Sequence, residues 1–442
     1  MKGKSAAAKT HRFRVVPALL NNDSVLSSRD ARASSDPFPF PSLVKRKKLI
    51  TGLAVMLAVS LALDQGLQHF VIDDGYLQGH RIAPFDPPLF CESQVAWNDR
   101  LTSHLDEGEP LPVSFKLDAE LGWCLPRGGP AKNATYDWSG SRIGFQPLPL
   151  MKTTGVTRVL TIGCSFTRGD EVANTETWAA VLDHDRNDLE LANMGVGAYG
   201  IDQALLRMRR DGLRLDPDEV WLGIFPYAAP RTVTTYRPAA RRWTGSPAFK
   251  PRFVLDELGE LELIPNPATT LAAVARLLSD HEFFLEAAGQ HDFRVSESPV
   301  CWLPNGSHAA HYSGFARLVL TAAETRRISP QELLRPADSE CHRVMLAIVL
   351  QTRKEVEAHG ARFRVLILPG RQDLISKASP EGAYWNTLAL ELRDAGVEVV
   401  DLADALIDAG AIEDDTLWAP QQHYSPAGNR IVADELTRVI KP

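Results

Sequence analysis

Two residues that lie far apart in the sequence have the types and settings that nucleophilic catalysis requires. Ser165 ends the run Arg158-Val-Leu-Thr-Ile-Gly-Cys-Ser, a short apolar stretch that is followed by a helix-forming segment. His423 opens the phrase His423-Tyr-Ser-Pro-Ala-Gly-Asn429, which precedes an amphipathic C-terminal segment. A serine hydroxyl is a weak nucleophile at neutral pH and needs a base that accepts and then returns its proton. The pair therefore predicts acyl-transfer chemistry if the fold brings the two side chains together.

Ser165 taken alone also has a purely structural explanation. A serine after glycine at the end of a strand often turns the chain or caps the next helix. The combination with His423 is more informative, because parallel α/β sheets bind ligands at the carboxyl edge of their strands. A histidine in the loop before the last helix can reach that edge and act as a general base.

The segments that must position these two residues alternate between strand-like and helix-like patterns from Val156 onward. This alternation predicts a parallel sheet with right-handed crossovers and helices on both faces. We expect an α/β, three-layer, flavodoxin-like fold with five parallel strands in the order 2-1-3-4-5. The expected strands are 158–163, 189–194, 219–225, 362–368 and 397–402, and the expected helices are 175–185, 201–212, 341–359, 384–395 and 426–440.

A long insertion interrupts this pattern after the third strand. We assign residues 152–442 to the α/β domain and 226–339 to the insertion, with a hairpin across 252–263 and helices within 269–289. Insertions at the strand edge of an α/β sheet commonly shape the substrate cleft. A lid with only a structural role remains an equal alternative.

The N-terminal region indicates a membrane anchor. Residues 1–48 hold eleven Lys/Arg and three Asp/Glu, so they carry +8 and leave −15 for the rest of a chain whose net charge is −7. Residues 1–44 are expected to be a disordered, basic cytoplasmic tail, and 45–68 a transmembrane helix. Its uncharged core, 49–63, covers only about 22 Å of a roughly 30 Å hydrocarbon layer. A cleaved signal peptide and a buried soluble helix are the alternatives.

Beyond the anchor, residues 69–151 are expected to form an irregular juxtamembrane segment that packs on the main domain. All five cysteines lie beyond the anchor, where an oxidising compartment permits disulfides. Proximity in sequence suggests the pairs Cys91–Cys124 and Cys301–Cys341, which leave Cys164 as a buried thiol. No spacing of residues is typical of metal ligands. His308 and His311 are three positions apart, but surface histidines in a loop explain them more simply. We expect no cofactor. The charge distribution argues for membrane topology and against a nucleic-acid partner.

Four phrases of the chain together resemble conserved blocks of the SGNH (GDSL-like) hydrolases. Gly163-Cys-Ser165-Phe is similar to block I, 193–203 to block II, 220–225 to block III and the His423 phrase to block V, in that order. The resemblance covers roughly residues 155–442. Leu121-Gly-Trp123 and the phrases between 250 and 266 are similar to a membrane-anchored, poorly characterised branch of the family. The resemblance implies the flavodoxin-like fold and hydrolysis or transfer of acyl esters, often on carbohydrate.

The family also implies donors for the oxyanion, and these correspond only partly. In the family the donors are the serine N–H, a block II glycine N–H and a block III asparagine side chain. Here Ala198 stands at the block II position, with Gly197 beside it, and an alanine can still supply its N–H. The block III asparagine falls near Tyr227 or Ala228, so Tyr227 and Arg231 are the nearby candidates to replace it. The simpler explanations are that the Tyr227 ring packs against its neighbours and that Arg231 is a solvated or ion-paired charge in a loop.

The chain also lacks an acid at the position where the family has the one that orients the histidine. The family places an aspartate three residues before the histidine, where this chain has Pro420. We slightly favour a Ser-His dyad in which a backbone carbonyl orients His423. Asp170 could approach the site, although a carboxylate at a helix start is its simpler explanation. The remaining alternatives are carboxylates from elsewhere, namely Asp401, Asp414 or Asp415.

Two functions are therefore expected. The first is a single-pass membrane protein whose main domain lies outside the cytoplasm and which hydrolyses or transfers acyl esters of a small molecule or a cell-surface polysaccharide. The second is a catalytically impaired relative that binds glycans or scaffolds an assembly, which the departures from blocks II and III favour. Protein partners and the acyl group are not specified by the sequence.

Overall fold

The centre of the protein is a parallel sheet whose strands follow the sequence prediction closely. The computed structural model describes residues 43–70, 72, 75–108, 116–131, 134–240 and 248–440. Five strands form the sheet in the order β13-β12-β9-β7-β8, which is the predicted order 2-1-3-4-5 counted from the opposite edge. They are β7 (Thr157–Gly163), β8 (Leu189–Asn193), β9 (Glu219–Ile224), β12 (Arg362–Ile367) and β13 (Glu398–Asp401). All four pairings are parallel.

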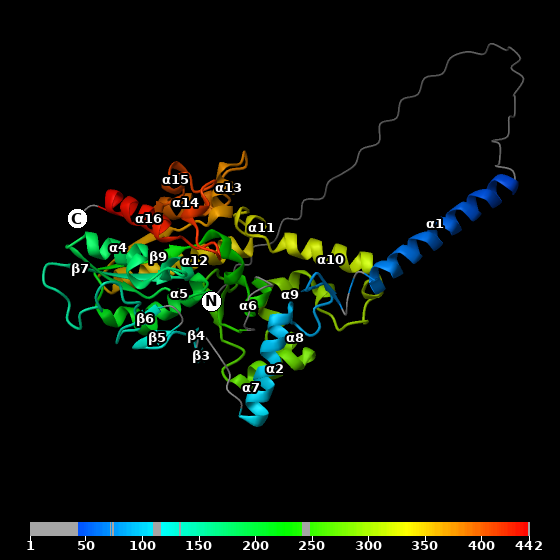
Figure 1. The fold of residues 1–442 in the computed structure, drawn as a ribbon, viewed down its shortest axis with the longest axis horizontal. Helices are drawn as coiled ribbons and strands as arrows, with labels where there is room; N and C mark the ends of the chain where they lie inside the picture. The colour runs from blue at the N-terminus through cyan, green and yellow to red at the C-terminus, as the bar shows by residue number, and fades with distance from the viewer. Residues whose placement is uncertain are drawn as a thin grey trace, which may run out of the picture. The chain divides into compact units, whose positions relative to one another are not determined.

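Helices cover both faces of this sheet (Figure 1). The crossover from β7 to β8 runs in one direction across the sheet and the later crossovers run in the other, so right-handed connections place their helices on opposite faces. On the first face α16 packs against α4, and α12 packs against α5 on the second. The helices of the domain are α3 (Ser165–Arg168), α4 (Trp178–Asp185), α5 (Ile201–Arg207), α12 (Glu340–Ala358), α13 (Arg371–Ala378), α14 (Asn386–Asp394), α15 (Ala403–Asp408) and α16 (Pro426–Val439).

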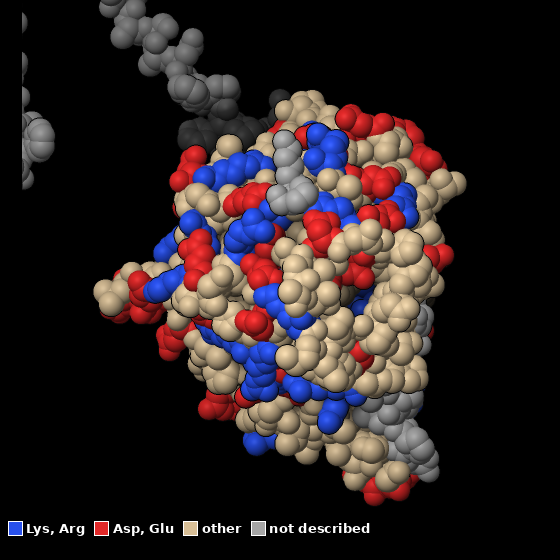
Figure 2. All heavy atoms as spheres, turned by 90° about the vertical axis from the view of Figure 1, so that its left-hand side faces the viewer, with Lys and Arg blue, Asp and Glu red and all other residues tan. Residues whose placement is uncertain are grey.

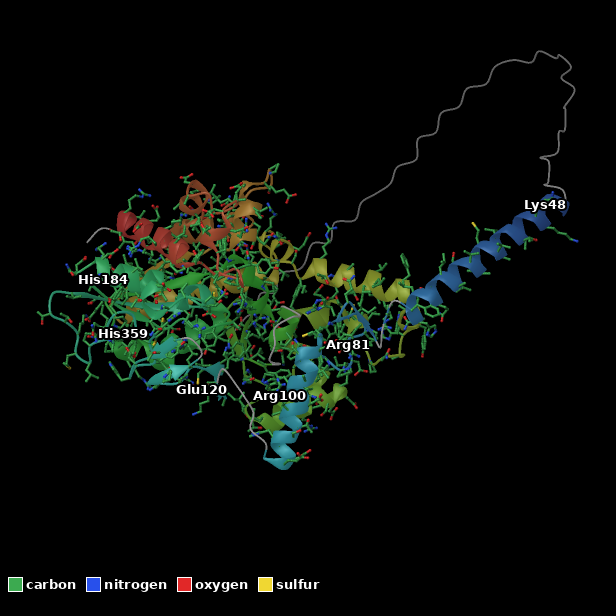
Figure 3. All side chains as sticks on the ribbon, in the orientation of Figure 1. Lys48, Arg81, Arg100, Glu120, His184 and His359 are labelled. Atoms are coloured by element: carbon green, nitrogen blue, oxygen red, sulfur yellow. The ribbon has the colours of Figure 1, made fainter. Side chains whose placement is uncertain are left out.

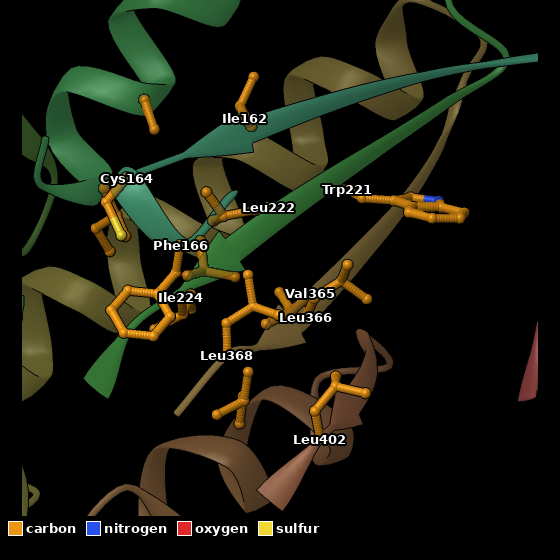
Figure 4. Packing of buried hydrophobic residues seen from close by; sticks show 14 of the residues in the cluster. Ile162, Cys164, Phe166, Trp221, Leu222, Ile224, Val365, Leu366, Leu368 and Leu402 are labelled. Atoms are coloured by element: carbon orange, nitrogen blue, oxygen red, sulfur yellow. The ribbon is translucent and has the colours of Figure 1, made fainter. Parts of the chain in front are cut away.

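The core of the domain lies between the sheet and these helices. Every residue of β9 is buried, as expected for a central strand that is covered on both faces. Figure 4 shows side chains from β7, β9 and β12 packed together, with Cys164 and Phe166 at the end of β7. Cys164 is buried, in agreement with the prediction that it is a packed thiol. The sheet therefore holds the backbone after β7 in a rigid setting.

The insertion contains the expected hairpin and helices. The antiparallel strands β10 (Arg252–Leu255) and β11 (Leu261–Ile264) form the hairpin, and α7 (Leu271–Ser279) and α8 (His281–Ala287) follow it. Its other elements are α6 (Arg237–Ala240), α9 (Phe293–Glu297), α10 (Gly314–Arg327) and α11 (Pro330–Leu334), with the 3-10 turn η4 (Pro226–Val233) directly after β9.

The segment between the anchor and the sheet is more regular than the sequence suggested. It contains α2 (Glu92–Glu107), a 16-residue helix, and short antiparallel strand pairs. Its aromatic residues form a second core with the insertion, in which Phe85 and Phe90 contact Trp302. The sequence pattern missed this helix because its apolar face is completed only by the insertion. The strands are β1 (Tyr76–Leu77), β2 (His80–Arg81), β3 (Lys116–Asp118), β4 (Gly122–Cys124), β5 (Gly129–Ala131) and β6 (Ala134–Tyr136).

The expected transmembrane segment is a helix, α1 (Leu43–Phe70). Within it Ile50–Phe70 is long and apolar enough to cross a membrane, with a mean hydropathy of 1.7. Lys47 and Lys48 are exposed near its first turn, and Figure 3 labels Lys48. The expected disordered tail falls, apart from Leu43 and Val44, outside the described residues.

The predicted disulfides are wrong for this structure, because all five cysteines are thiols. Cys341 is buried in the main core, where its thiol donates to the carbonyl of Ala229 at 3.4 Å, and Cys301 belongs to the second core. Cys91 has its sulfur 3.1 Å from the hydroxyl of Ser93, and Cys124 lies on β4. Proximity in sequence misled the pairing, since the fold assigns Cys301 and Cys341 to different cores.

Candidate active site

Ser165 lies at the carboxyl end of β7, next to the point where the sheet crossovers change direction. The strand ends at Gly163, whose φ of +148° allows the chain to pass close to β9. A Cβ there would meet the Thr167 hydroxyl at 2.3 Å and the Gly223 carbonyl at 2.7 Å. Ser165 then begins α3, so its N–H lies in the first turn, where N–H groups have no intrahelical acceptor. The residue is 6% exposed, so Ser165 is recessed at this edge of the sheet.

His423 reaches the same edge of the sheet from the loop before α16. Its imidazole ring lies 5.1 Å, between centroids, from the ring of Phe166, the residue that follows Ser165. The loop is fixed on both sides of the ring. Asn429 donates to the Tyr424 carbonyl at 3.0 Å and accepts from the Trp178 N–H at 2.9 Å, while the Tyr424 hydroxyl donates to the Pro369 carbonyl at 2.7 Å. The structure thus places His423 beside α3, at the edge of the sheet where Ser165 lies, and no hydrogen bond joins the side chains of these two described residues.

A carboxylate that the sequence analysis did not identify holds the imidazole. Oε2 of Glu171 lies 2.7 Å from Nδ1 of His423 and accepts the backbone N–H of the same residue at 3.3 Å. Its other oxygen accepts the N–H of Gln421 at 2.7 Å. An ionised carboxylate only accepts hydrogen bonds, so in a neutral imidazole this contact favours the tautomer with the proton on Nδ1 and the lone pair on Nε2. Nε2 is the nitrogen that a serine base requires.

Backbone strain is concentrated around this pair. Among the described residues, five non-glycine residues have a positive φ, and three of them belong to this edge: Glu171 at +71°, Ala198 at +69° and Gln422 at +70°. Such conformations cost on the order of 1–3 kcal/mol each and persist where the surrounding contacts enforce them. Glu171 lies in the segment after α3 and Gln422 in the loop before α16, and the Glu171 carboxylate joins these two segments. The strain is consistent with a site built for geometry rather than for stability.

The other carboxylates that the sequence suggested have partners other than His423. Asp401 accepts from the Trp385 indole N–H and the Ala403 N–H, both at 3.0 Å. Asp415 pairs with Arg371, and Asp414 caps the turn at Thr416. Asp170, the neighbour of Glu171, pairs with Arg168. The signal for Glu171 was the acidic pair directly after the left-handed Gly169, but nothing in the sequence chose between the two acids.

The block II loop places Ala198 in a conformation that is usual for glycine. The loop is joined to the end of β7 by the N–H of Val196, which donates to the Gly163 carbonyl at 3.0 Å. Gly197 is buried and Ala198 is half-buried. The φ of +69° at Ala198 lies in the left-handed region that favours glycine, so an alanine here is held against its preference. The geometry retains Ala198 as a candidate oxyanion donor.

Arg231 and Tyr227, the two candidates to replace the block III asparagine, both contact other parts of the protein. Arg231 is buried and donates to the Tyr199 carbonyl at 3.0 Å, so it ties the turn after β9 to the block II loop. Tyr227 stacks on Phe225 with ring centroids 5.9 Å apart, and its backbone N–H faces the carboxylate of Asp373. These contacts agree with structural roles for both residues, and their part in binding an oxyanion stays a prediction.

A small cavity lies at the switch point of the sheet, where Cys164 lines it and Ser165 does not. It is lined by the ends of β7 and β9, the block II loop and α12, including Gly163, Gly200, Phe225 and Met345. Its volume of about 10 Å³ has room for about one water molecule, which is too small for an acyl chain.

Within the described ranges, no group of three or more His, Cys, Asp or Glu is arranged to hold a metal ion. Basic and acidic side chains are interspersed on the face in Figure 2.

No family model matches this chain, and no curated protein matches it. Solved structures are similar to it at low identity. A lipolytic protein of the G-D-S-L family from Desulfitobacterium hafniense is 14% identical, with 64% of this chain and 99% of that chain covered and a TM-score of 0.32. The acetyl xylan esterase AlAXEase is 14% identical over 64% and 100%, also at 0.32. A catalytic mutant of an acetylxylan esterase from Geobacillus stearothermophilus is 13% identical over 65% and 95%, at 0.33.

Proposed function

We propose that this chain is an SGNH-type ester hydrolase, anchored in a membrane by α1, in which Ser165, His423 and Glu171 act as a catalytic triad. The observation that carries the proposal is the contact between Glu171 and Nδ1 of His423 at the edge of the sheet where Ser165 lies. A carboxylate in this position fixes the tautomer and stabilises the imidazolium that forms during the reaction.

The reaction follows from these roles. Oγ of Ser165 attacks the acyl carbonyl and forms a C–O bond, while its proton moves to Nε2 of His423. The N–H groups of Ser165 and Ala198 are the candidates to bind the developing oxyanion. The ester C–O bond then breaks, and His423 returns the proton to the leaving alcohol. Water, or another hydroxyl in an acyltransferase, attacks the acyl-enzyme and regenerates the serine.

The substrate class and the topology are further parts of the proposal. Lys47 and Lys48 before the apolar part of α1 favour a cytoplasmic N-terminus, which sends residues 71–442 across the membrane. An anchored esterase on that side fits acyl esters of cell-surface or exported polysaccharide. Such substrates have many hydroxyl groups, so either water or a sugar hydroxyl could serve as the acceptor.

A binding protein without turnover is the second candidate. The recessed Ser165, which is only 6% exposed, favours this alternative, because a substrate carbonyl must reach its hydroxyl. The two functions therefore differ in whether substrate reaches the hydroxyl.

Turnover of a small aryl acetate by the full chain in mild detergent separates the two candidates. We expect hydrolysis by the wild-type protein and its loss in Ser165→Ala, with unchanged thermal unfolding. Ser376→Ala is a matched control, because Ser376 lies on α13 and its hydroxyl has no role in the proposal. Equal turnover by wild type and Ser165→Ala would leave only the binding function.

A further inference from the structure

We propose that Trp123, from the segment that precedes the α/β domain, is a positioning residue that aims the Ala198 N–H for the reaction described above. Three consecutive carbonyls of the block II loop accept hydrogen bonds from side chains outside the loop. Trp123 Nε1 donates to Gly197 at 3.1 Å, Arg237 Nε to Ala198 at 3.3 Å and Arg231 to Tyr199 at 3.0 Å. The inference rests on the proposed function and names what controls its oxyanion donor.

The geometry of the peptide bond links these contacts to the N–H groups. In a trans peptide the carbonyl of one residue and the N–H of the next point in opposite directions. The bond from Trp123 to the Gly197 carbonyl therefore directs the Ala198 N–H away from the indole. The N–H of Tyr199 donates to the Val196 carbonyl at 3.3 Å, and that of Gly200 to the Gln203 side chain at 3.2 Å.

Of the N–H groups of Ala198, Tyr199 and Gly200, that of Ala198 is therefore the one without an acceptor in the loop. Within the part of the chain that the structure describes, it donates to no protein acceptor. Its φ of +69° is unfavourable for alanine, so the loop needs external contacts to keep this N–H oriented. The hydrogen bonds that Trp123, Arg237 and Arg231 donate to the loop carbonyls supply these contacts.

Trp123 is itself held in place for this role. It is buried, and its own carbonyl accepts the Tyr199 hydroxyl at 2.6 Å, so the indole and the loop are bound to each other twice. The two rings meet edge to face with centroids 5.7 Å apart. Family-type esterases need this N–H direction, and here the segment outside the α/β domain provides it.

The test is the aryl acetate kinetics of Trp123→Phe, which removes the indole N–H and keeps an aromatic ring. We expect kcat to fall about 10- to 100-fold with KM unchanged, less than the roughly 100- to 1000-fold cost of losing an oxyanion donor, because the Ala198 N–H remains and is only less well aimed. Trp138→Phe is the matched control, because the Trp138 indole donates to a carbonyl, that of Leu148 at 2.9 Å, outside the candidate site. Its kcat should stay within twofold of wild type.

A second substitution separates positioning from general damage. In Ala198→Gly the left-handed conformation costs little, so the double variant Trp123→Phe/Ala198→Gly should recover part of the lost kcat. If Trp123→Phe does not fold, Arg237→Met should also lower kcat at constant KM, because it removes the donor to the Ala198 carbonyl and so loosens the left-handed conformation of Ala198. Unchanged kcat, or a change in KM alone, would overturn the inference. Wild-type activity that depends on Ser165 shows that such a result leaves the proposed function standing.

We also infer, from a different observation, that the exposed apolar face of α10 contacts the lipid leaflet at the end of α1. Asp64 of α1 accepts the hydroxyl of Ser313 at 2.9 Å and the N–H of Phe315 at 2.8 Å, which caps the start of α10. Gly314 lets the helices approach, since a Cβ there would meet the backbone nitrogen of Gln68 at 3.0 Å. The last turns of α1 and the first turn of α10 are therefore in contact.

The residues around this junction suit a membrane interface. Phe315 and Tyr312 are both 67% exposed, and Val319, one turn further along α10, is 50% exposed. Aromatic residues are enriched where a protein crosses from lipid to water. The uncharged part of α1 ends at Leu63 and covers only about 22 Å, so apolar side chains next to Asp64 would extend the surface available to lipid.

Nitroxide accessibility in lipid nanodiscs tests this second inference on the full chain. We expect a label at Phe315→Cys to be reached by oxygen and shielded from a water-soluble nickel complex, whereas Leu390→Cys on α14 reacts as a water-exposed site. Nickel access at Phe315 would overturn the inference, and so would shielding from both reagents, which indicates a protein partner. A label at Leu57→Cys reports α1 separately, so a failure of the anchor is distinguished from a failure at α10.

Discussion

The carboxylate of Glu171 lies 2.7 Å from Nδ1 of His423, although 252 positions separate the two residues in the chain. In the family that the sequence resembles, the acid stands three residues before the histidine. Here the carboxylate that contacts the histidine follows the serine helix instead, so under the proposed triad one short segment supplies both the nucleophile and the acid. This arrangement explains how Pro420 is compatible with a triad.

The role of Glu171 predicts a large loss of activity in Glu171→Gln. The amide keeps the size of the side chain but removes the charge that stabilises the imidazolium, and it can favour the wrong tautomer of His423. Changing the carboxylate of a serine triad to its amide costs on the order of 10⁴-fold in kcat in a well-studied case, so we expect a fall of about 10² to 10⁴-fold with little change in KM.

Asp415→Asn is the control for this substitution. Its side chain is exposed and paired with Arg371, so the hydrolysis rate should remain within about twofold of wild type. Equal losses in the two variants, or activity retained in Glu171→Gln, would contradict the role given to Glu171.

The sheet was predictable from the sequence because each strand is a short apolar run followed by a helical pattern. All five strands match their predicted ranges within one or two residues at each end, as β12 (Arg362–Ile367) does. The identity of the acid was not predictable, because Asp170 and Glu171 are adjacent carboxylates after Gly169. Only the left-handed backbone at Glu171 decides which of them turns toward His423. The disulfide pairing failed for a similar reason, since it depends on packing between distant segments.

The thiol state of the cysteines gives a direct chemical prediction. We expect all five to be alkylated when the protein is unfolded without a reductant, because the structure pairs none of them. Intact mass spectrometry counts the adducts. A species with three or one would show that export is followed by disulfide formation and rearrangement of at least one core.

Asp373 predicts a pH dependence of stability. Burial raises the pKa of its carboxyl to about 7, against the opposing effects of hydrogen bonds from Tyr384 and two backbone N–H groups. Between about pH 4 and 7 the folded state therefore binds more protons than the unfolded state, so stability falls as pH rises through this window. The upper bound is about 4 kcal/mol. Denaturation midpoints from pH 5 to 8 should decline more steeply in wild type than in Asp373→Asn, and parallel curves would contradict this origin.

The buried ion pair between Lys250 and Asp202 predicts a large loss of stability when one partner is removed. Both side chains are fully buried, and Lys250 also donates to the Pro251 carbonyl at 3.0 Å. Lys250→Met leaves a buried carboxylate unpaired, which typically costs about 3–5 kcal/mol. Arg430→Met breaks an exposed pair with Asp185 and should cost less than about 1 kcal/mol. Comparable unfolding midpoints for the two variants would refute the structural role of Lys250.

The most direct test of the central claim is covalent labelling of Ser165 by a fluorophosphonate, read by peptide mass spectrometry on the full-length protein. The proposed triad predicts one adduct, on Ser165, that forms readily in wild type and at least a hundredfold more slowly in His423→Ala. An adduct that forms equally fast in both proteins, or none on Ser165 in the folded wild type, would contradict it.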